Sequence, residues 1–556
     1  MDVSESNQSD WPLRPWLLAG ALGLAGLLVW LLSDGANHSP WRMAGTAFVF
    51  FGSIAAAFTA ERDRWKEPLS FALIAGLVMA GLAWRATAAG DRYADEEYGF
   101  AAGVIATALA LPLFQAGFHR TRFATPYARV HYHVWTDAIC AAGALAFTGA
   151  AWLLLVLMSE LFHLLKIDLL REAMGEEWFG WTYSGVAFGA ALGTLRNQVK
   201  VLGTLQAVVT LVLSILAVPL ALGLALFLVA MIVSGPEVLW QATRSATPVL
   251  LACAAGAWVL ANAILRDSDG EMSGNRVLRG AAFALALAIL PLTVFAAVSL
   301  GTRVAQHGLS PERLWGLAAI SVACAYGLAW FVALVRGLKR GTWREGLRRA
   351  NLYLAVLISG VALLLALPIL DFGAISARNQ IARLESGAVS PEDFDYAALR
   401  WDFGDTGRQA LARLQRSGNP RIAELAELAA KQSQRTYGFG RGRDFRSADE
   451  LELRVQPDDP ELRRMVVDYL RANAYVCQEF CVALDLGADA KGRREVALVE
   501  SGRYSRVALP AGTQEPEVAP AAPAGFGPSS RVEIRTVPER YIFVDGRKVG
   551  PPLGSE

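Results

Sequence analysis

The sequence is poor in charge and lacks familiar catalytic motifs. Only 19% of its 556 residues are Asp, Glu, Lys or Arg, and the 52 basic residues nearly balance the 51 acidic ones. A nucleic-acid partner would need a concentrated basic face, which this balance does not support. Walker loops, His-Glu-x-x-His motifs, Gly-x-Ser-x-Gly elbows and dinucleotide fingerprints are absent from the sequence. We therefore expect no cofactor and no bound metal, and lean away from an enzyme.

Cysteine is also scarce, with five residues in the chain. Cys140, Cys253 and Cys324 lie in apolar stretches, where a thiol behaves as a small apolar side chain. Cys477 and Cys481 lie together in the polar C-terminal part, and both a local disulfide and two free thiols are compatible with their spacing. A redox-active dithiol is disfavoured because the Cys-x-x-Cys spacing is missing.

Long apolar runs are what the sequence does contain. A helix needs roughly 20 apolar residues to cross the hydrocarbon of a bilayer, because it must satisfy its own backbone hydrogen bonds there. We predict a mainly α polytopic bundle of about eleven spans, with ten or twelve as alternatives, followed by a small α+β soluble domain. The predicted spans are approximately 15–33, 41–60, 69–86, 100–117, 138–164, 179–195, 201–233, 246–265, 280–299, 314–335 and 351–370.

Two of these spans are unusual. Residues 179–195 are rich in Gly and Ala and could form a re-entrant segment instead of a crossing. A helix over residues 201–233 would be about 50 Å long, so it must tilt, protrude or kink, and Pro219 removes a helical hydrogen bond near its middle.

Basic residues alternate between the loops, and Lys and Arg are retained on the cytoplasmic side during insertion. One set of loops carries eighteen of them: Arg14, Arg62, Arg64, Lys66, Arg120, Arg122, Arg129, Arg196, Lys200, Arg266, Arg276, Arg279, Arg336, Lys339, Arg340, Arg344, Arg348 and Arg349. The other set carries seven: Arg85, Arg92, Lys166, Arg171, Arg244, Arg303 and Arg313. We therefore expect residues 1–14 in the cytoplasm, the transmembrane domain over 15–370 and, after an odd number of spans, an exported C-terminal part that is periplasmic in a bacterium.

The C-terminal part changes from apolar runs to amphipathic segments. Residues 371–509 are expected to form a soluble domain, with helices near 422–429 and 462–470 and strands near 482–484, 496–499 and 504–509. Ser390 before Pro391 predicts a helix start at Pro391, as Ser310 does before Pro311. Residues 510–530 are predicted to be a Pro- and Ala-rich linker, and 531–556 to contain a hairpin around Asp545 and Gly546.

Ionisable residues in a membrane are costly, so Glu160 and His163 in the fifth span form the candidate intramembrane polar site. Their spacing of three residues places them on one helix face. The simpler interpretation is that both lie at the outer headgroup level and reach water. Gln206 and Asn262 are better explained as interhelical hydrogen-bonding groups than as ligands. His131 and His133 are too few to hold a metal and are assigned to an inside loop that contacts lipid.

Two stretches carry a family resemblance. Residues 299–315 read Ser-Leu-Gly-Thr-Arg-Val-Ala-Gln-His-Gly-Leu-Ser-Pro-Glu-Arg-Leu-Trp, and residues 371–380 read Asp-Phe-Gly-Ala-Ile-Ser-Ala-Arg-Asn-Gln, followed by residues 381–384 and Gly387. Both resemble segments of an uncharacterised bacterial multi-pass family, domain of unknown function 4153. The resemblance covers most of residues 15–420 and implies a bacterial inner-membrane location, but the family has no agreed activity.

Both stretches are predicted on the outer face, so we expect them to meet in a polar seam between the bundle and the exported domain. The candidate seam residues are Arg303, Arg313, Asp371, Arg378, Asn379 and Gln380. The simpler interpretation is that Arg313 and Asp371 are ordinary interfacial charges.

Three classes of function remain. The favoured one is a non-enzymatic protein of transport or cell-envelope maintenance, whose small-molecule substrate is unknown. The alternatives are an envelope sensor or assembly scaffold that contacts other envelope proteins through its exported domain, and a lipid-modifying enzyme. The partner predicted in every case is the lipid bilayer.

Overall fold

The computed structural model describes residues 11–34, 39–94, 96–235, 246–339, 341–432, 435, 452–472, 477, 480–488, 493–500, 503–509, 517–519, 542–544 and 547–549. The chain divides into two compact units. The first unit comprises Met1–Ala382 and Asp402–Gly407, and the second comprises Arg383–Trp401 and Arg408–Glu556. The first unit is a helical bundle and contains the candidate site.

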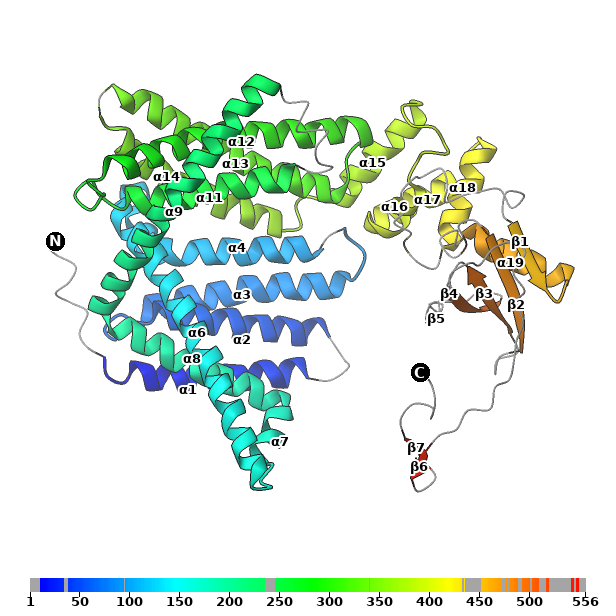
Figure 1. The fold of residues 1–556 in the computed structure, drawn as a ribbon, viewed down its shortest axis with the longest axis horizontal. Helices are drawn as coiled ribbons and strands as arrows, with labels where there is room; N and C mark the ends of the chain where they lie inside the picture. The colour runs from blue at the N-terminus through cyan, green and yellow to red at the C-terminus, as the bar shows by residue number, and fades with distance from the viewer. Residues whose placement is uncertain are drawn as a thin grey trace. The chain divides into compact units, whose positions relative to one another are not determined.

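The N-terminal half of the bundle is built from long helices that lie side by side (Figure 1). Helix α1 packs against α2 and α8, while α3 packs between α2 and α4. The helices are α1 (Arg14–Ser33), α2 (Pro40–Thr59), α3 (Lys66–Ala89), α4 (Glu96–Gln115), α6 (Tyr127–Leu164) and α8 (Glu177–Asn197), with the short α5 (Phe118–Thr121), η1 (Arg122–Ala124) and α7 (Leu169–Gly175) between them.

The C-terminal half has its own apolar core. Its largest fully buried side chains include Trp330 and Leu347, together with a run of leucines and alanines on α12. Helix α14 packs against α4 and so joins the two halves. The helices are α9 (Val199–Ser234), α11 (Thr247–Leu265), α12 (Arg276–His307), α13 (Pro311–Leu338) and α14 (Trp343–Ala366).

Among the described residues, ten helices are long and apolar enough to cross a membrane: α1, α2, α3, α4, α6, α9, α11, α12, α13 and α14. The predicted mainly α membrane bundle is therefore confirmed. Helix α8, which matches the predicted span 179–195, is not among the ten by composition. Its 21 residues are nevertheless one continuous helix rather than a re-entrant segment.

Helix α8 runs antiparallel to α1 along most of its length. A side chain at Gly189 would collide with the carbonyl of Leu18, and one at Gly185 with the carbonyl of Leu22. Because both positions are glycine, the two backbones approach closely, as small residues allow between membrane helices. If α1 spans a bilayer, α8 spans it as well, and the number of crossings becomes eleven.

The two longest helices are much longer than a bilayer requires. Helix α6 has 38 residues and α9 has 36, which makes each more than 50 Å long at about 1.5 Å per residue. Both run obliquely to α2, α3 and α4 (Figure 1). Helix α6 begins at Tyr127, so the assignment of His131 and His133 to a loop was wrong: both lie in its first turns, and His131 is buried. Because hydropathy detects only apolar segments, it did not detect the polar first turns of this helix.

The second unit begins with helices and ends with strands, as predicted. Helices α18 (Pro420–Lys431) and α19 (Pro460–Ala472) and strands β2 (Phe480–Ala488), β3 (Arg494–Glu500) and β4 (Arg503–Leu509) match the predicted segments. The remaining elements of the chain are α15 (Phe372–Glu385), most of which belongs to the first unit, α17 (Gly404–Leu414), which begins in the first unit, and α16 (Tyr396–Trp401), β1 (Glu452–Gln456), β5 (Glu517–Ala519), β6 (Ile542–Val544) and β7 (Arg547–Val549).

The main sheet has the strand order β1-β2-β3-β4-β5, with β1 parallel to β2 and the other neighbours antiparallel. Helix α19 connects β1 to β2 and packs Leu462, Val466 and Leu470 into a core with Cys481 and Val496. Strand β5 lies inside the segment 510–530 that the sequence assigns to a linker. Strands β6 and β7 form an antiparallel pair, while their predicted Asp545–Gly546 turn lies outside the described residues.

The predicted helix start at Pro391 was wrong. Ser390 Oγ accepts a hydrogen bond from Asp393 N, but this closes only a turn, and helix α16 starts at Tyr396 with Asp395 bonded to Ala398 N. Phe394 and Tyr396 are 3% and 1% exposed. Burying these two rings redirects the chain, so tertiary packing overrides the local capping signal.

Candidate functional site

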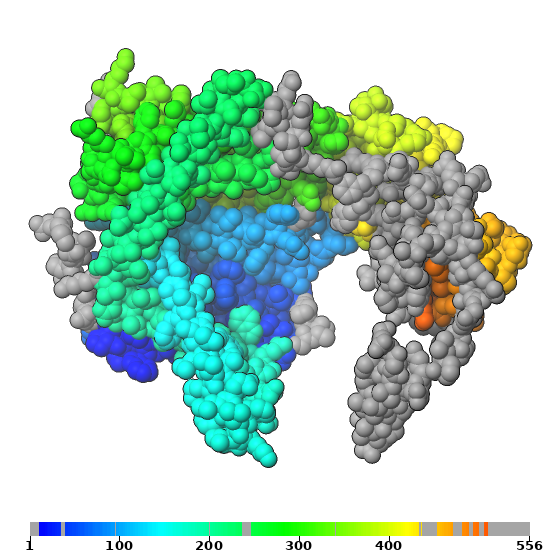
Figure 2. Space-filling view, viewed as in Figure 1, coloured from blue at the N-terminus to red at the C-terminus, as the bar shows by residue number. Residues whose placement is uncertain are grey.

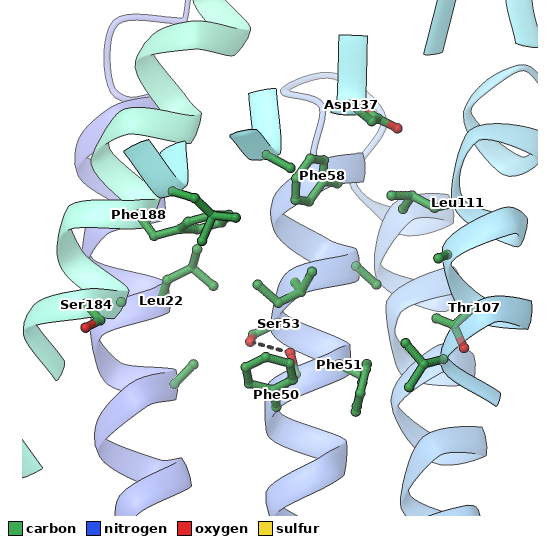
Figure 3. A pocket seen from close by; sticks show the side chains of 18 of the residues that line it. Leu22, Phe50, Phe51, Ser53, Phe58, Thr107, Leu111, Asp137, Ser184 and Phe188 are labelled. Carbon is green, nitrogen blue, oxygen red and sulfur yellow. Dashed lines mark hydrogen bonds between the residues drawn. The ribbon is translucent and has the colours of Figure 1, made fainter. Parts of the chain in front are cut away.

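The N-terminal half of the bundle contains a cavity of about 700 Å³ between α1, α2, α4, α6 and α8 (Figure 3). Most of its lining is apolar, with Phe58 and Phe188 among the aromatic side chains. In Figure 2, the dark blue of α2 is visible in a hollow bordered by the cyan α6 and the lighter blue α4. Phe50, Leu145 and Trp181 line the cavity and are 41%, 62% and 44% exposed. The cavity therefore opens to the surface of the bundle.

The arrangement of the helices explains why this space is left open. Close packing at glycines holds α8 on α1, and both helices form one side of the cavity. Helix α6 crosses obliquely and diverges from α2 and α4 (Figure 1). Small side chains such as Ala108 on α4 and Ala138 on α6 face the space, and both are exposed. The sequence thus places small residues where larger ones would fill the cavity.

Asp137 of α6 is the one ionisable side chain among the described residues that line the cavity. Its Oδ1 accepts a hydrogen bond of 3.2 Å from Gln115 Nε2, which also donates to the carbonyl of Phe58 at 2.8 Å. Asp137 Oδ2 and Gln115 Oε1 are both buried and have no hydrogen-bond partner among the described residues. The site therefore combines an apolar wall with two unpaired acceptor atoms.

One arginine lies near this carboxylate. Arg196 is close enough to Asp137 to interact with it electrostatically, although no ion pair joins them within the described part of the chain. Arg196 Nη1 donates to the carbonyl of Ala57 at 2.6 Å, and Arg14 Nη1 in turn donates to the carbonyl of Arg196 at 3.0 Å.

A second polar cluster lies where α6, α11, α13 and α14 meet. Asn351 Oδ1 accepts hydrogen bonds from the indole nitrogens of Trp258 and Trp330, at 3.1 and 3.0 Å. Asn351 Nδ2 donates to Asn262 Oδ1 at 2.7 Å and to the Tyr127 hydroxyl at 3.2 Å. These side chains satisfy one another, so the cluster ties helices together. Asn262 was predicted to play this role; for Gln206, the described residues provide no such bond.

The structure places the predicted pair Glu160 and His163 near the end of α6, outside the cavity lining. Glu160 is exposed, while the His163 ring contacts Asp168 at 2.5 Å and Arg171 at 3.5 Å. His163 is thus paired with the segment that follows α6.

The structure brings together part of the predicted seam. Asn379 Oδ1 accepts a 2.8 Å bond from Leu309 N, and Gln380 Nε2 donates to the carbonyls of His307 and Leu309. These bonds attach α15 to the turn between α12 and α13, all within the first unit.

Three charged members of the predicted seam form hydrogen bonds with backbone atoms close to them in the sequence. Arg313 donates to the carbonyls of His307 and Gly308, and Asp371 accepts from Ala374 N at the start of α15. Arg378 is exposed and donates to the carbonyl of Ala374 on its own helix. Arg303 is half-buried on α12 and has no ion pair within the described part of the chain.

The two C-terminal cysteines are joined in the structure by a disulfide. The Cα atoms of Cys477 and Cys481 are 5.9 Å apart, and both side chains are buried in the core between α19 and the sheet. Across the described residues, no group of three or more His, Cys, Asp or Glu side chains could hold a metal ion.

Sequence reasoning missed Asp137 because it precedes the predicted fifth span by one residue. Gln115 falls at the end of the predicted fourth span. Both positions are close to predicted span ends, where polar residues are ordinary and draw no attention. A helix prediction that began at Tyr127 would have placed Asp137 three turns inside a helix and drawn attention to it.

These features define a polytopic membrane protein with a small C-terminal α+β part. A family model described as "Domain of unknown function (DUF4153)" matches residues 16–414, and the chain belongs to this family. No curated protein and no solved structure matches the chain.

Proposed function

We propose that this protein binds the acyl chain of a lipid in the cavity between α1, α2, α4, α6 and α8, and that it acts in lipid transport or cell-envelope maintenance. The observation that carries the proposal is an apolar cavity of about 700 Å³ that opens to the surface of a membrane bundle. Ligand pockets of proteins are typically about 300–1,000 Å³ and mostly apolar. In a bilayer, acyl chains are the molecules that such a space admits.

The physical reason for occupancy is packing. Lipid tails are as apolar as leucine, so transfer of a tail from the bilayer gains little from the hydrophobic effect. The side chains around an empty space lack contacting atoms on one side and forgo dispersion energy. A flexible chain that fills the space restores those contacts. The apolar lining therefore favours a lipid over a hydrophilic substrate, which would need a polar path.

We propose binding at this cavity and no catalytic reaction. A lipid-modifying enzyme would need an acid and a base, or a nucleophile and a base, at the same place. Asp137 alone supplies an ionisable group among the described lining residues.

From the family we further propose a bacterial inner-membrane location. The basic residues of the loops support an orientation with the N-terminus cytoplasmic and the C-terminal part periplasmic.

The first prediction concerns Ala138, which faces the cavity and is exposed. The change Ala138→Phe should fill part of the space and reduce lipid occupancy several-fold. The measurement is photocrosslinking of the full chain in nanodiscs with a diazirine-bearing phospholipid, followed by mass spectrometry. In the wild type, crosslinks should concentrate on lining peptides that contain Phe50, Phe58 and Val134.

Ala146→Phe is the matched control, because Ala146 is exposed on the same helix but lies outside the cavity lining. It should leave those crosslinks unchanged. Equal labelling of the lining peptides in both variants, at equal thermal stability, would contradict the proposal. So would wild-type labelling that is no higher on these peptides than on the exposed face of α9.

A further inference from the structure

The cavity has a polar end and an apolar end. Figure 3 shows Asp137 near Phe58, whereas Phe50 and Phe51 lie about two turns away along α2. Eight residues separate Phe50 from Phe58, which corresponds to about 12 Å along a helix. A ligand that fills this space therefore meets the one carboxylate of the described lining at one end, while at the other end the Ser53 hydroxyl already donates to the carbonyl of Phe50. This arrangement suits an amphiphile.

The polar end lacks hydrogen-bond donors. A carboxylate offers about four acceptor sites, and the structure gives Asp137 one donor, Gln115 Nε2. Asp137 Oδ2 and Gln115 Oε1 are buried and have no partner among the described residues. Leaving such atoms unpaired in a buried site is unfavourable, because they have lost their hydrogen bonds to water. An occupant that brings donors would remove this cost.

The neighbouring side chains do not donate hydrogen bonds to these two oxygen atoms. Gln115 Nε2 already donates to Phe58 and to Asp137, and Arg196 and Arg14 donate to backbone carbonyls. Thr136 is adjacent to Asp137 on α6, but its hydroxyl donates to the carbonyl of Tyr132.

We infer that Asp137, which Gln115 holds in place by a hydrogen bond, recognises the polar end of the lipid and that this end carries N–H or O–H donors. This inference rests on the proposed function, because it assigns the ligand class of the same cavity. Primary ammonium and hydroxyl groups share the required chemistry. A quaternary ammonium carries charge without an N–H donor, so Asp137 discriminates against it.

The experiment uses three photoactivatable probes with the same alkyl chain and different end groups: a primary amine, an alcohol and a trimethylammonium. Each is added to the full chain in nanodiscs, and labelling of the cavity-lining peptides is quantified. The wild type should take up the amine or the alcohol about ten-fold better than the trimethylammonium probe, as one charge-assisted hydrogen bond allows. The better of the two donor probes identifies the end group.

Two variants test the role of Asp137. Asp137→Leu removes both carboxylate oxygens and should abolish the preference for donor probes, while Asp137→Asn retains the shape and one acceptor and should reduce it. Thr136→Val is the matched control, since Thr136 is adjacent on the helix and absent from the lining. This variant should keep the wild-type preference. Thermal melts of the three variants identify any that do not fold.

The outcomes separate the two proposals. Equal labelling of the cavity by all three probes would overturn the inference and leave the acyl-chain proposal standing, since the chain would then enter without recognition of its end. An unchanged preference in a folded Asp137→Leu variant would also overturn the inference. No cavity labelling by any probe in the wild type would overturn the proposed function itself.

Discussion

Buried polar side chains in this bundle fall into two groups according to whether their hydrogen bonds are complete. Asn351 uses both its oxygen and its nitrogen and contacts four other side chains. Asp137 retains an unpaired oxygen next to an open cavity. A complete network stabilises packing, whereas an incomplete one at a cavity is available to a ligand. This difference is why we assign structure to Asn351 and recognition to Asp137.

In the second unit, one ion-pair cluster has a pH dependence that can be predicted. Arg494 bonds Asp485 at 2.7 Å, and this hydrogen bond lowers the pKa of the Asp485 carboxyl below its usual value of 3.8. Because the folded-state pKa is the lower one, the ion pair stabilises the fold fully above the unfolded pKa. The stability is lost as the pH falls through the folded-state pKa.

The expected result is that Asp485→Asn lowers the melting temperature of the second unit at neutral pH. The difference from the wild type should shrink as the pH falls below the unfolded-state pKa and through the lower folded-state pKa, because the Asp485 carboxyl then becomes protonated in both states. Thermal melts of the full chain would measure the melting temperature. Hydrogen exchange of β2 and β3 would assign the change to the second unit. Asp458→Asn is the control, since Asp458 is exposed. A difference that does not vary with pH would contradict this account.

At the level of elements, the apolar runs predicted the membrane-spanning helices well, whereas capping residues predicted one helix start correctly and another wrongly. Ser310 caps α13 as expected, with its Oγ accepting from Arg313 N. Ser390 does not start a helix, because Phe394 and Tyr396 are needed in the core. Local patterns suffice where one helix crosses an apolar medium, since each helix then satisfies its own backbone. They fail where long-range packing decides the path of the chain.

The cavity could not be predicted for the same reason. Its lining comes from five helices, and its existence depends on the oblique path of α6 and the close contact of α1 with α8. Neither property is encoded in a local pattern. The sequence nonetheless contained a clue in the glycines at 185, 189 and 193, which recur every four residues along one face of α8.

The contact between α1 and α8 gives the prediction at this scale. Gly189→Val should push α8 away from the carbonyl of Leu18 and destabilise the bundle by about 1–3 kcal/mol, as overpacking typically does. Gly180→Val is the control, because a Cβ at Gly180 would meet nothing within 4 Å. Thermal unfolding of the purified full chain in detergent would compare them. Similar melting temperatures for the two variants would show that this contact is not close-packed.

For the whole molecule, the number of crossings determines sidedness. Ten crossings would return the C-terminal part to the side of the N-terminus, and eleven place it on the opposite side. Since α8 lies antiparallel to α1, we predict eleven. Reporter fusions should place the C-terminal part opposite both the N-terminus and the loop near Lys339. A C-terminal reporter on the same side as the N-terminus would contradict eleven crossings, and one on the same side as Lys339 would mean that α14 does not cross the membrane.

The boundary between the two units has a practical consequence for dissecting the protein. Residues Asp402–Gly407 belong to the first unit, although the residues on either side of them belong to the second. Asp405 N donates to the carbonyl of Arg92 at 2.8 Å, and Gly404 approaches that carbonyl with a positive φ of 63°. After a single proteolytic cut between Ser386 and Asp395, the C-terminal fragment would therefore still be held to the first unit through residues Asp402–Gly407. A truncation at the same place would remove these residues from the first unit together with the second unit.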